Sequence, residues 1–242
     1  MPPADTTLDP GLMPALRRMV RGLSLLFWGL PLALVVAVGA VFADWFRPLR
    51  EAPALAAAGM LLYGVHLLAT FRPAEPPWQS SVDRARMLAL AGLGLAPFLH
   101  WWNSAPSIDV FFYSLVAYAA TAFLFLLNLN FLLQRLAAMM PDPILREDTR
   151  LFARINLSLL LMVLALLLLY LVAAELAFRR PPPNPFLEAI QKVNHLRREL
   201  FVSLVLLPLA TTMSMLWKTK EAVLSSVFSQ VPSLPIESQI QD

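Results

Sequence analysis

The chain alternates between long apolar runs and short polar segments. Six runs stand out, at about residues 22–43, 53–71, 87–102, 109–134, 155–178 and 200–217. A helix needs about 20 predominantly apolar residues to cross the hydrocarbon core of a bilayer. The strands of a membrane barrel would instead alternate apolar and polar positions. The pattern predicts an all-α, polytopic membrane protein with one bundle of six transmembrane helices over residues 22–217.

The third run, 87–102, is the weakest of the six. It is the shortest, and it contains Gly92, Gly94 and Pro97. If it crosses the membrane, twelve of the 19 basic residues fall on the N-terminal side and seven on the other; if it is re-entrant, five spans remain and the split is eleven to eight. Because basic residues concentrate in cytoplasmic loops, the count favours six spans with a cytoplasmic N-terminus.

The segments outside the bundle are polar. Residues 1–21 consist of a proline-rich tail and a short basic interfacial segment, and residues 218–242 form a partly disordered C-terminal tail. Arg17, Arg18 and Arg21 precede the first apolar run, as in a signal peptide. That run is longer than the roughly 7–15 residues of a secretory apolar region, which favours a retained first helix.

Composition narrows the function classes. The chain is 58% hydrophobic and 14% charged, against roughly 45–50% and about 25% in soluble domains. It has no cysteine, which removes disulfides, thiolate nucleophiles and cysteine-bound metals. The net charge of +3 comes from basic residues at the ends of apolar runs, where they anchor to anionic lipid headgroups rather than to nucleic acid. Arginine far outnumbers lysine, which we take to indicate a GC-rich bacterial genome and therefore an inner membrane.

Two flanking segments are basic and amphipathic. Asn184 and Pro185 are typical of a helix start, and Lys192 and Arg198 lie on the polar face of the helix that follows. After Asp142, the side chains of Arg146, Arg150 and Arg154 recur every four residues along one helix face. For the helix after Asn184 we favour a plain interfacial anchor, and the alternative is a basic face that binds anionic headgroups or a partner. The three like charges at Arg146, Arg150 and Arg154 repel one another, so we expect anionic headgroups or an acidic partner surface to compensate them.

The fourth run carries a polar stripe. Its members recur every seven residues, close to two helical turns: Ser114, Thr121, Asn128 and Arg135, with Tyr118 on the same side. Asn130 and Gln134 lie on another side. Such a stripe is typical of a seam between helices; the alternative is a polar cavity or a substrate path.

Depth links the stripe to other spans. In the six-span arrangement His66, Asn128, Thr211 and Thr212 all lie about 9–10 Å inside the basic residue that ends their span, at 1.5 Å per residue. The candidate binding cluster within the membrane therefore comprises His66, Ser114, Tyr118, Thr121, Asn128, Thr211 and Thr212.

No motif in the sequence specifies a reaction. The chain lacks HExxH, G-x-S-x-G and a phosphate-binding glycine loop, so we expect no catalytic residue. A haem held by His66 and His100 is disfavoured because the two lie about 12 Å apart along the membrane normal by the helical rise; we expect no metal and no cofactor.

The sequence favours an accessory or scaffold component with a membrane-protein partner or as a homo-oligomer. A small transporter or channel that uses the fourth span is the alternative, and a lipid-acting enzyme ranks third.

Overall fold

The computed structural model describes residues 12–40, 47–71, 76–105, 108–139, 143–179 and 184–228. Every element within these ranges is helical, which confirms the predicted all-α class. The elements are α1 (Leu12–Val38), the short 3-10 helix η2 (Arg47–Leu49), α2 (Ala52–Ala69), α3 (Pro76–Leu95), α4 (Pro97–Ser104), α5 (Asp109–Met139), α6 (Pro143–Arg179) and α7 (Asn184–Phe228).

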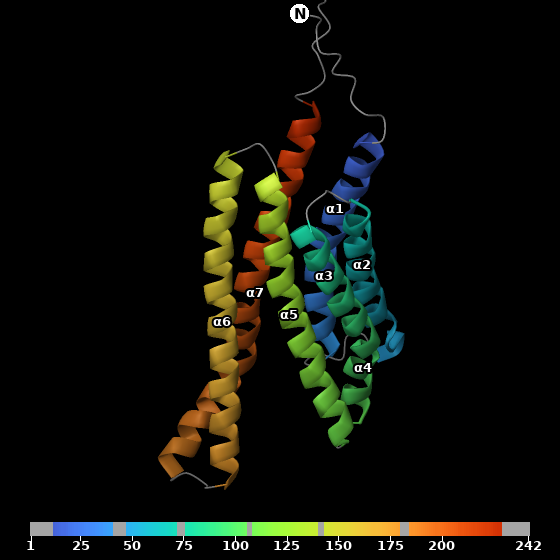
Figure 1. Cartoon of the computed structure of the whole chain (residues 1–242). Helices are drawn as coiled ribbons and strands as arrows, with labels where there is room; N and C mark the ends of the chain where they lie inside the picture. Colours follow the sequence, from blue (N-terminus) through green and yellow to red (C-terminus); the bar gives the residue numbers. More distant parts are fainter. Residues whose placement is uncertain are drawn as a thin grey trace, which may run out of the picture.

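The helices form a bundle in which successive rods run in opposite directions (Figure 1). The exception is α3 and α4, which continue in one direction and have only Ala96 between them. The start of α1 and the end of α7 lie at the same end of the bundle, together with the end of α5 and the start of α6 (Figure 1). We call this the terminal end. η2 and the end of α4 lie at the opposite end.

Four helices in the described ranges are long and apolar enough to cross a membrane. These stretches are Pro14–Val38, Ala52–Ala69, Asp109–Met139 and Arg146–Leu166. They overlap the first, second, fourth and fifth of the six predicted spans, with bounds shifted by up to about nine residues at the start and twelve at the end. The third and sixth predicted spans fall within α3–α4 and α7.

The helices extend beyond the predicted spans because the flanking amphipathic segments join them without a break. The segments predicted to lie on the membrane before spans one, five and six are the first turns of α1, α6 and α7. The α3 helix begins 11 residues before the apolar run that it contains. The α7 helix continues to Phe228, and residues 1–11 and 229–242 lie outside the described residues.

Glycine allows α1 and α2 to pack closely. A Cβ added to Gly22 would lie 2.8 Å from the carbonyl oxygen of Gly64, and one added to Gly64 would lie 3.0 Å from Leu26 Cγ. Small residues at such crossings bring two backbones into van der Waals contact. The main apolar core continues from this contact through Leu26 and Val65 towards α5 and α7.

Pro97 explains the break between α3 and α4. Proline has no N–H and its ring clashes with the preceding turn, so the helix is interrupted while Ala96 keeps right-handed helical dihedral angles, with φ −55° and ψ −39°. The chain therefore bends without reversing its direction (Figure 1).

Candidate functional site

The polar stripe of α5 faces α3 and α4. The side-chain amide of Asn128 donates a hydrogen bond of 2.9 Å from Nδ2 to the backbone oxygen of Ser81 on α3. Two turns nearer the start of α5, Thr121 Cγ2 lies 4.0 Å from the position that a Cβ on Gly92 would take. Tyr118 packs against a small apolar cluster that includes Ala96 and Leu99. The stripe is therefore the contact surface of α5 with α3 and α4.

The serine and threonine hydroxyls of the stripe bond within their own helix. Ser114 Oγ donates to the carbonyl oxygen of Val110, and Thr121 Oγ1 donates to that of Ala117, each over 2.8 Å. This pattern satisfies a hydroxyl in an apolar environment without a partner helix. It leaves their protons engaged rather than directed at a ligand.

Asn130 lies on a different side of α5 from Asn128, as predicted from the spacing. It is only 5% exposed, and its Nδ2 donates to the carbonyl oxygen of Leu126 over 2.8 Å. Its Oδ1 is buried without a hydrogen-bond partner among the described residues, and so is the hydroxyl oxygen of Thr219 on α7. Burial of these atoms could not be read from the sequence.

A complete polar cluster joins α6 to α7. Asn156 is fully buried, and its Nδ2 donates to Thr212 Oγ1 over 2.8 Å. Its Oδ1 accepts from Thr211 Oγ1, also over 2.8 Å. Thr212 donates in turn to the carbonyl oxygen of Pro208. We call Asn156, Thr211 and Thr212 the α6–α7 cluster. It pairs two predicted residues with Asn156, which the sequence analysis did not include as a candidate although it is a lone amide in an apolar run.

The predicted intramembrane candidates do not converge on one place. Asn128 bonds to α3, whereas Thr211 and Thr212 bond to α6. His66 is exposed on the surface of α2. Helical depth alone placed these residues at a similar level, but it carries no information on which way each side chain points.

The predicted basic face on α6 is exposed at the terminal end. Arg146, Arg150 and Arg154 all point outward, and Arg146 Nη2 donates to the carbonyl oxygen of Ala138 at the end of α5 over 3.2 Å. The side chains of Lys192 and Arg198, in the second predicted basic face, lie outside the described residues. Whether these faces bind headgroups stays a prediction.

A salt bridge connects the same end of α6 to α7. Lys218 Nζ lies 2.8 Å from Asp148 Oδ2, and it also stands 4.8 Å from the centroid of the Phe152 ring. Both charged side chains are more than 40% exposed, so the pair contributes about 0–1 kcal/mol. The pair is therefore a minor contact between α6 and α7.

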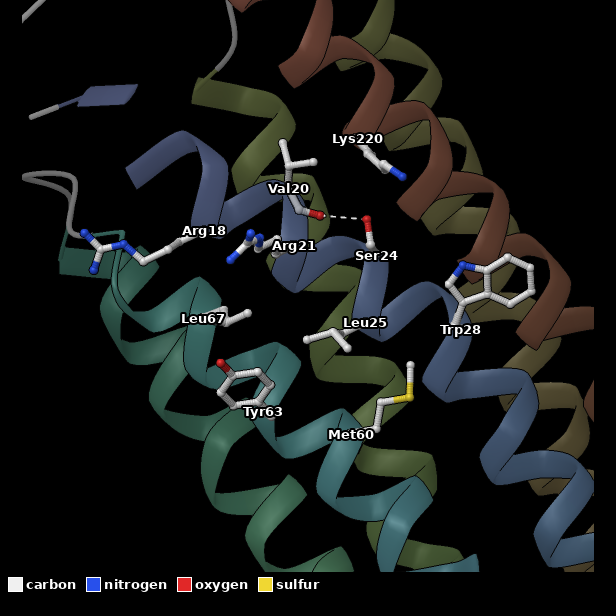
Figure 2. Close-up of a pocket in the computed structure, with 10 residues that line it drawn as sticks. All are labelled: Arg18, Val20, Arg21, Ser24, Leu25, Trp28, Met60, Tyr63, Leu67 and Lys220. Carbon is white, nitrogen blue, oxygen red and sulfur yellow. Dashed lines mark hydrogen bonds between the residues drawn. The ribbon is translucent and has the colours of Figure 1, made fainter. Parts of the chain in front are cut away.

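An open groove lies between α1, α2 and α7 near the terminal end (Figure 2). Its volume is about 600 Å³. The lining combines three cations with a mostly apolar wall and includes no carboxylate: Arg18, Val20, Arg21, Ser24, Leu25, Trp28, Met60, Tyr63, Leu67 and Lys220. Ser24 is engaged within α1, because its hydroxyl donates to the Val20 carbonyl oxygen over 2.9 Å.

This groove was not predicted from the sequence. A signal was present, because Arg18, Arg21, Leu25 and Trp28 follow one another at intervals of three, four and three residues, which is one helix face. The contribution of α2 and of Lys220 on α7 depends on tertiary packing and has no counterpart in the local pattern.

Among the described residues, no group of three or more His, Asp or Glu side chains is arranged to hold a metal ion. Comparison with other proteins adds no functional assignment: the chain matches no known protein family, and no curated protein and no solved structure is similar to it.

Proposed function

We propose that the protein is a six-span protein of the bacterial inner membrane with both termini in the cytoplasm. The alternating direction of the rods supports this topology, since it brings the starts of α1 and α6, which carry Arg17 and Arg150, to the terminal end (Figure 1). Positive residues favour the cytoplasmic side. In this topology α3–α4 and α7 each cross once, in addition to the four helices that are long and apolar enough by themselves.

Within that membrane the protein acts as a non-catalytic accessory or scaffold component. The observation that carries this proposal is the engagement of its intramembrane polar groups in structure. The α6–α7 cluster bonds internally, Asn128 bonds to α3, and Ser114 and Thr121 bond to their own helix. A seam of this kind stabilises a bundle by about 0.6–2 kcal/mol per hydrogen bond, and it engages these particular groups with protein atoms rather than with a substrate.

The exposed apolar surface of α5 is where we expect a partner helix to pack. Its first half presents small and aromatic side chains outward, including Tyr113, Ala117 and Ala120. Small residues let a second helix approach closely in a bilayer. The partner is either another membrane protein or a second copy of this chain.

Purification tests the scaffold proposal. The protein is extracted in a mild detergent, and its oligomeric state and bound proteins are determined by size-exclusion chromatography and mass spectrometry. We expect a stable complex, or a homo-oligomer, that Ala117→Phe and Ala120→Phe disrupt. A solitary monomer, in wild type and variants alike, would contradict the proposal.

The alternative is a small transporter or channel that uses Ser114, Thr121 and Asn128. It requires water along this face of α5. Single cysteines at the three positions, on a chain that has no native cysteine, are treated with a membrane-impermeant thiol reagent. The scaffold proposal predicts protection at all three, whereas reaction at all three would favour transport.

A further inference from the structure

The groove between α1, α2 and α7 has a basic part followed by an apolar part, as in a binding site for an amphiphile. Its upper part, at the terminal end, holds the cations Arg18, Arg21 and Lys220. Its lower part is walled by Leu25, Trp28 and Met60 (Figure 2). We propose that this groove binds one anionic glycerophospholipid, with the headgroup in the basic part of the groove around Arg21 and an acyl chain along the apolar wall. The inference rests on the membrane location in the proposed function but not on the scaffold role.

The positive charge of the groove is not neutralised by acidic residues in its lining. None of the ten lining residues is acidic. The salt bridge between Lys218 and Asp148 uses none of the three cations. Lys220 Nζ instead lies 5.4 Å from the centroid of the Trp217 ring, a contact that keeps the ammonium charge available. Arg18 and Arg21 come from α1 and Lys220 from α7, so the cations are spread along the groove, with Arg21 between the other two (Figure 2). Arg18 Nε also donates to the carbonyl oxygen of Pro14 over 3.2 Å. Arginine and lysine are the donors that a phosphate prefers.

The apolar wall continues from the charged part in the direction of the membrane interior. Trp28 follows Arg21 by seven residues, about 10 Å along the α1 axis, and its side chain is 64% exposed. The same face of α1 continues with Leu32 and Val35, which are also exposed. A headgroup at Arg21 would therefore have its acyl chain in contact with this face over a further four turns of helix.

The position of Tyr63 on α2 indicates that the groove lies at the headgroup level of the membrane. Its ring is 56% exposed and lines the groove across from α1. Tyrosine and tryptophan concentrate at the headgroup level of membranes, and here they flank the transition from charged to apolar lining. A free phosphate ion would make no contact with the apolar wall, whereas an acyl chain would cover it. We therefore assign the ligand to the bilayer.

The test is a lipid titration of the full-length protein in a nonionic detergent, with bound lipid counted by native mass spectrometry. We expect phosphatidylglycerol to bind in preference to phosphatidylcholine. Each basic residue near an anionic headgroup contributes about 1 kcal/mol, so Arg18→Gln with Arg21→Gln should weaken phosphatidylglycerol binding about thirtyfold by the tenfold-per-1.4-kcal/mol conversion. Equal binding of the two lipids by wild type would overturn the proposal.

A matched control removes the same charge elsewhere. Arg84 and Arg86 are exposed on α3 and do not line the groove. Their double replacement by glutamine should leave phosphatidylglycerol binding within about twofold of wild type, a difference of about 0.4 kcal/mol. If it weakens binding as much as the groove variant does, net charge rather than the groove attracts the lipid, and the proposal fails.

Two further measurements keep the proposal testable if the double groove variant does not fold. Lys220→Gln changes the third cation from another helix and should weaken binding about fivefold, since one basic residue contributes about 1 kcal/mol. Glycerol phosphate, which carries the headgroup without acyl chains, should not displace phosphatidylglycerol at equal concentration. Displacement would show that the apolar wall contributes nothing. A monomer without protein partners that still binds phosphatidylglycerol would contradict the scaffold role alone.

Discussion

Asn128 and Asn130 are two residues apart on α5 and have different surroundings. Asn128 bonds across the seam to Ser81 on α3, whereas the Asn130 amide bonds within its own helix and its buried Oδ1 has no partner among the described residues. We expect Asn128→Leu to lower the free energy of unfolding by about 0.6–2 kcal/mol. Asn130→Leu removes a buried oxygen that has no partner, so it should be close to neutral or stabilising.

Unfolding of both variants in mixed detergent micelles, with increasing sodium dodecyl sulfate, measures the difference. Wild-type protein is the reference, and the circular dichroism signal follows the helices. Equal tolerance of both substitutions would mean that the bond between Asn128 and Ser81 contributes nothing to the seam.

The α6–α7 cluster gives a second prediction at this scale. Asn156→Leu removes two hydrogen bonds between the helices, while Thr211 and Thr212 keep the Pro208 carbonyl oxygen as an acceptor. We expect a loss of about 1–3 kcal/mol, since each such bond contributes about 0.6–2 kcal/mol. Ser158→Ala is the control, because Ser158 is exposed and bonds only to Arg154 on its own helix. The same unfolding titration would contradict the prediction if the control and Asn156→Leu behaved alike.

Sequence spacing predicted which residues share a face but not what each face contacts. The opposite orientations of Asn128 and Asn130 follow from the 100° step of a helix, and the structure agrees. The partner of Asn128 lies 47 residues away in sequence, and the partners of Asn156 lie 55 and 56 residues away. These contacts depend on the packing of whole helices. For the same reason, His66 could be assigned a depth but not an outward orientation.

At the scale of the elements, the contact between α1 and α2 depends on two glycines. Gly22→Ala would place a Cβ 2.8 Å from the backbone oxygen of Gly64, which forces the two helices apart. Overpacking of this kind costs about 1–3 kcal/mol. Gly59→Ala on α2 is the matched control: a Cβ there has nothing within 4 Å, and alanine is about 1 kcal/mol more favourable than glycine in a helix.

The thermal midpoint of the purified protein in detergent, followed by tryptophan fluorescence, measures this pair. We expect a lower midpoint for Gly22→Ala and an unchanged or higher midpoint for Gly59→Ala. A Gly22→Ala protein as stable as wild type would show that α1 and α2 do not approach as closely as described.

The positions of the helices were largely predictable and their lengths were not. Apolar runs locate a helix because a bilayer requires about 20 apolar residues. They do not show where it ends when an amphipathic segment continues the same 3.6-residue period. The helices α6 and α7 begin at Pro143 and Asn184, well before their apolar runs. These starts were predicted from the basic helix face after Asp142 and from the helix-start residues Asn184 and Pro185, not from the apolar runs. Pro97 shows the opposite case. It interrupts the helix inside an apolar run, so that α3 ends and α4 begins there, but the chain continues in the same direction.

At the scale of the whole molecule, the antiparallel order of the rods has a direct consequence for topology. Ser80 near the start of α3 and Ser225 near the end of α7 lie at the terminal end, whereas Ser104 ends α4 at the opposite end (Figure 1). All three are exposed. If α3–α4 crosses the membrane, Ser104 is on the outer side and the other two are in the cytoplasm.

Labelling of single cysteines in intact cells tests this topology most directly, because the chain has no native cysteine. We predict that a membrane-impermeant maleimide labels Ser104→Cys in intact cells, and that it labels Ser80→Cys and Ser225→Cys only after the membrane is permeabilised. Labelling of Ser80→Cys and Ser104→Cys from the same side would contradict the six-span arrangement.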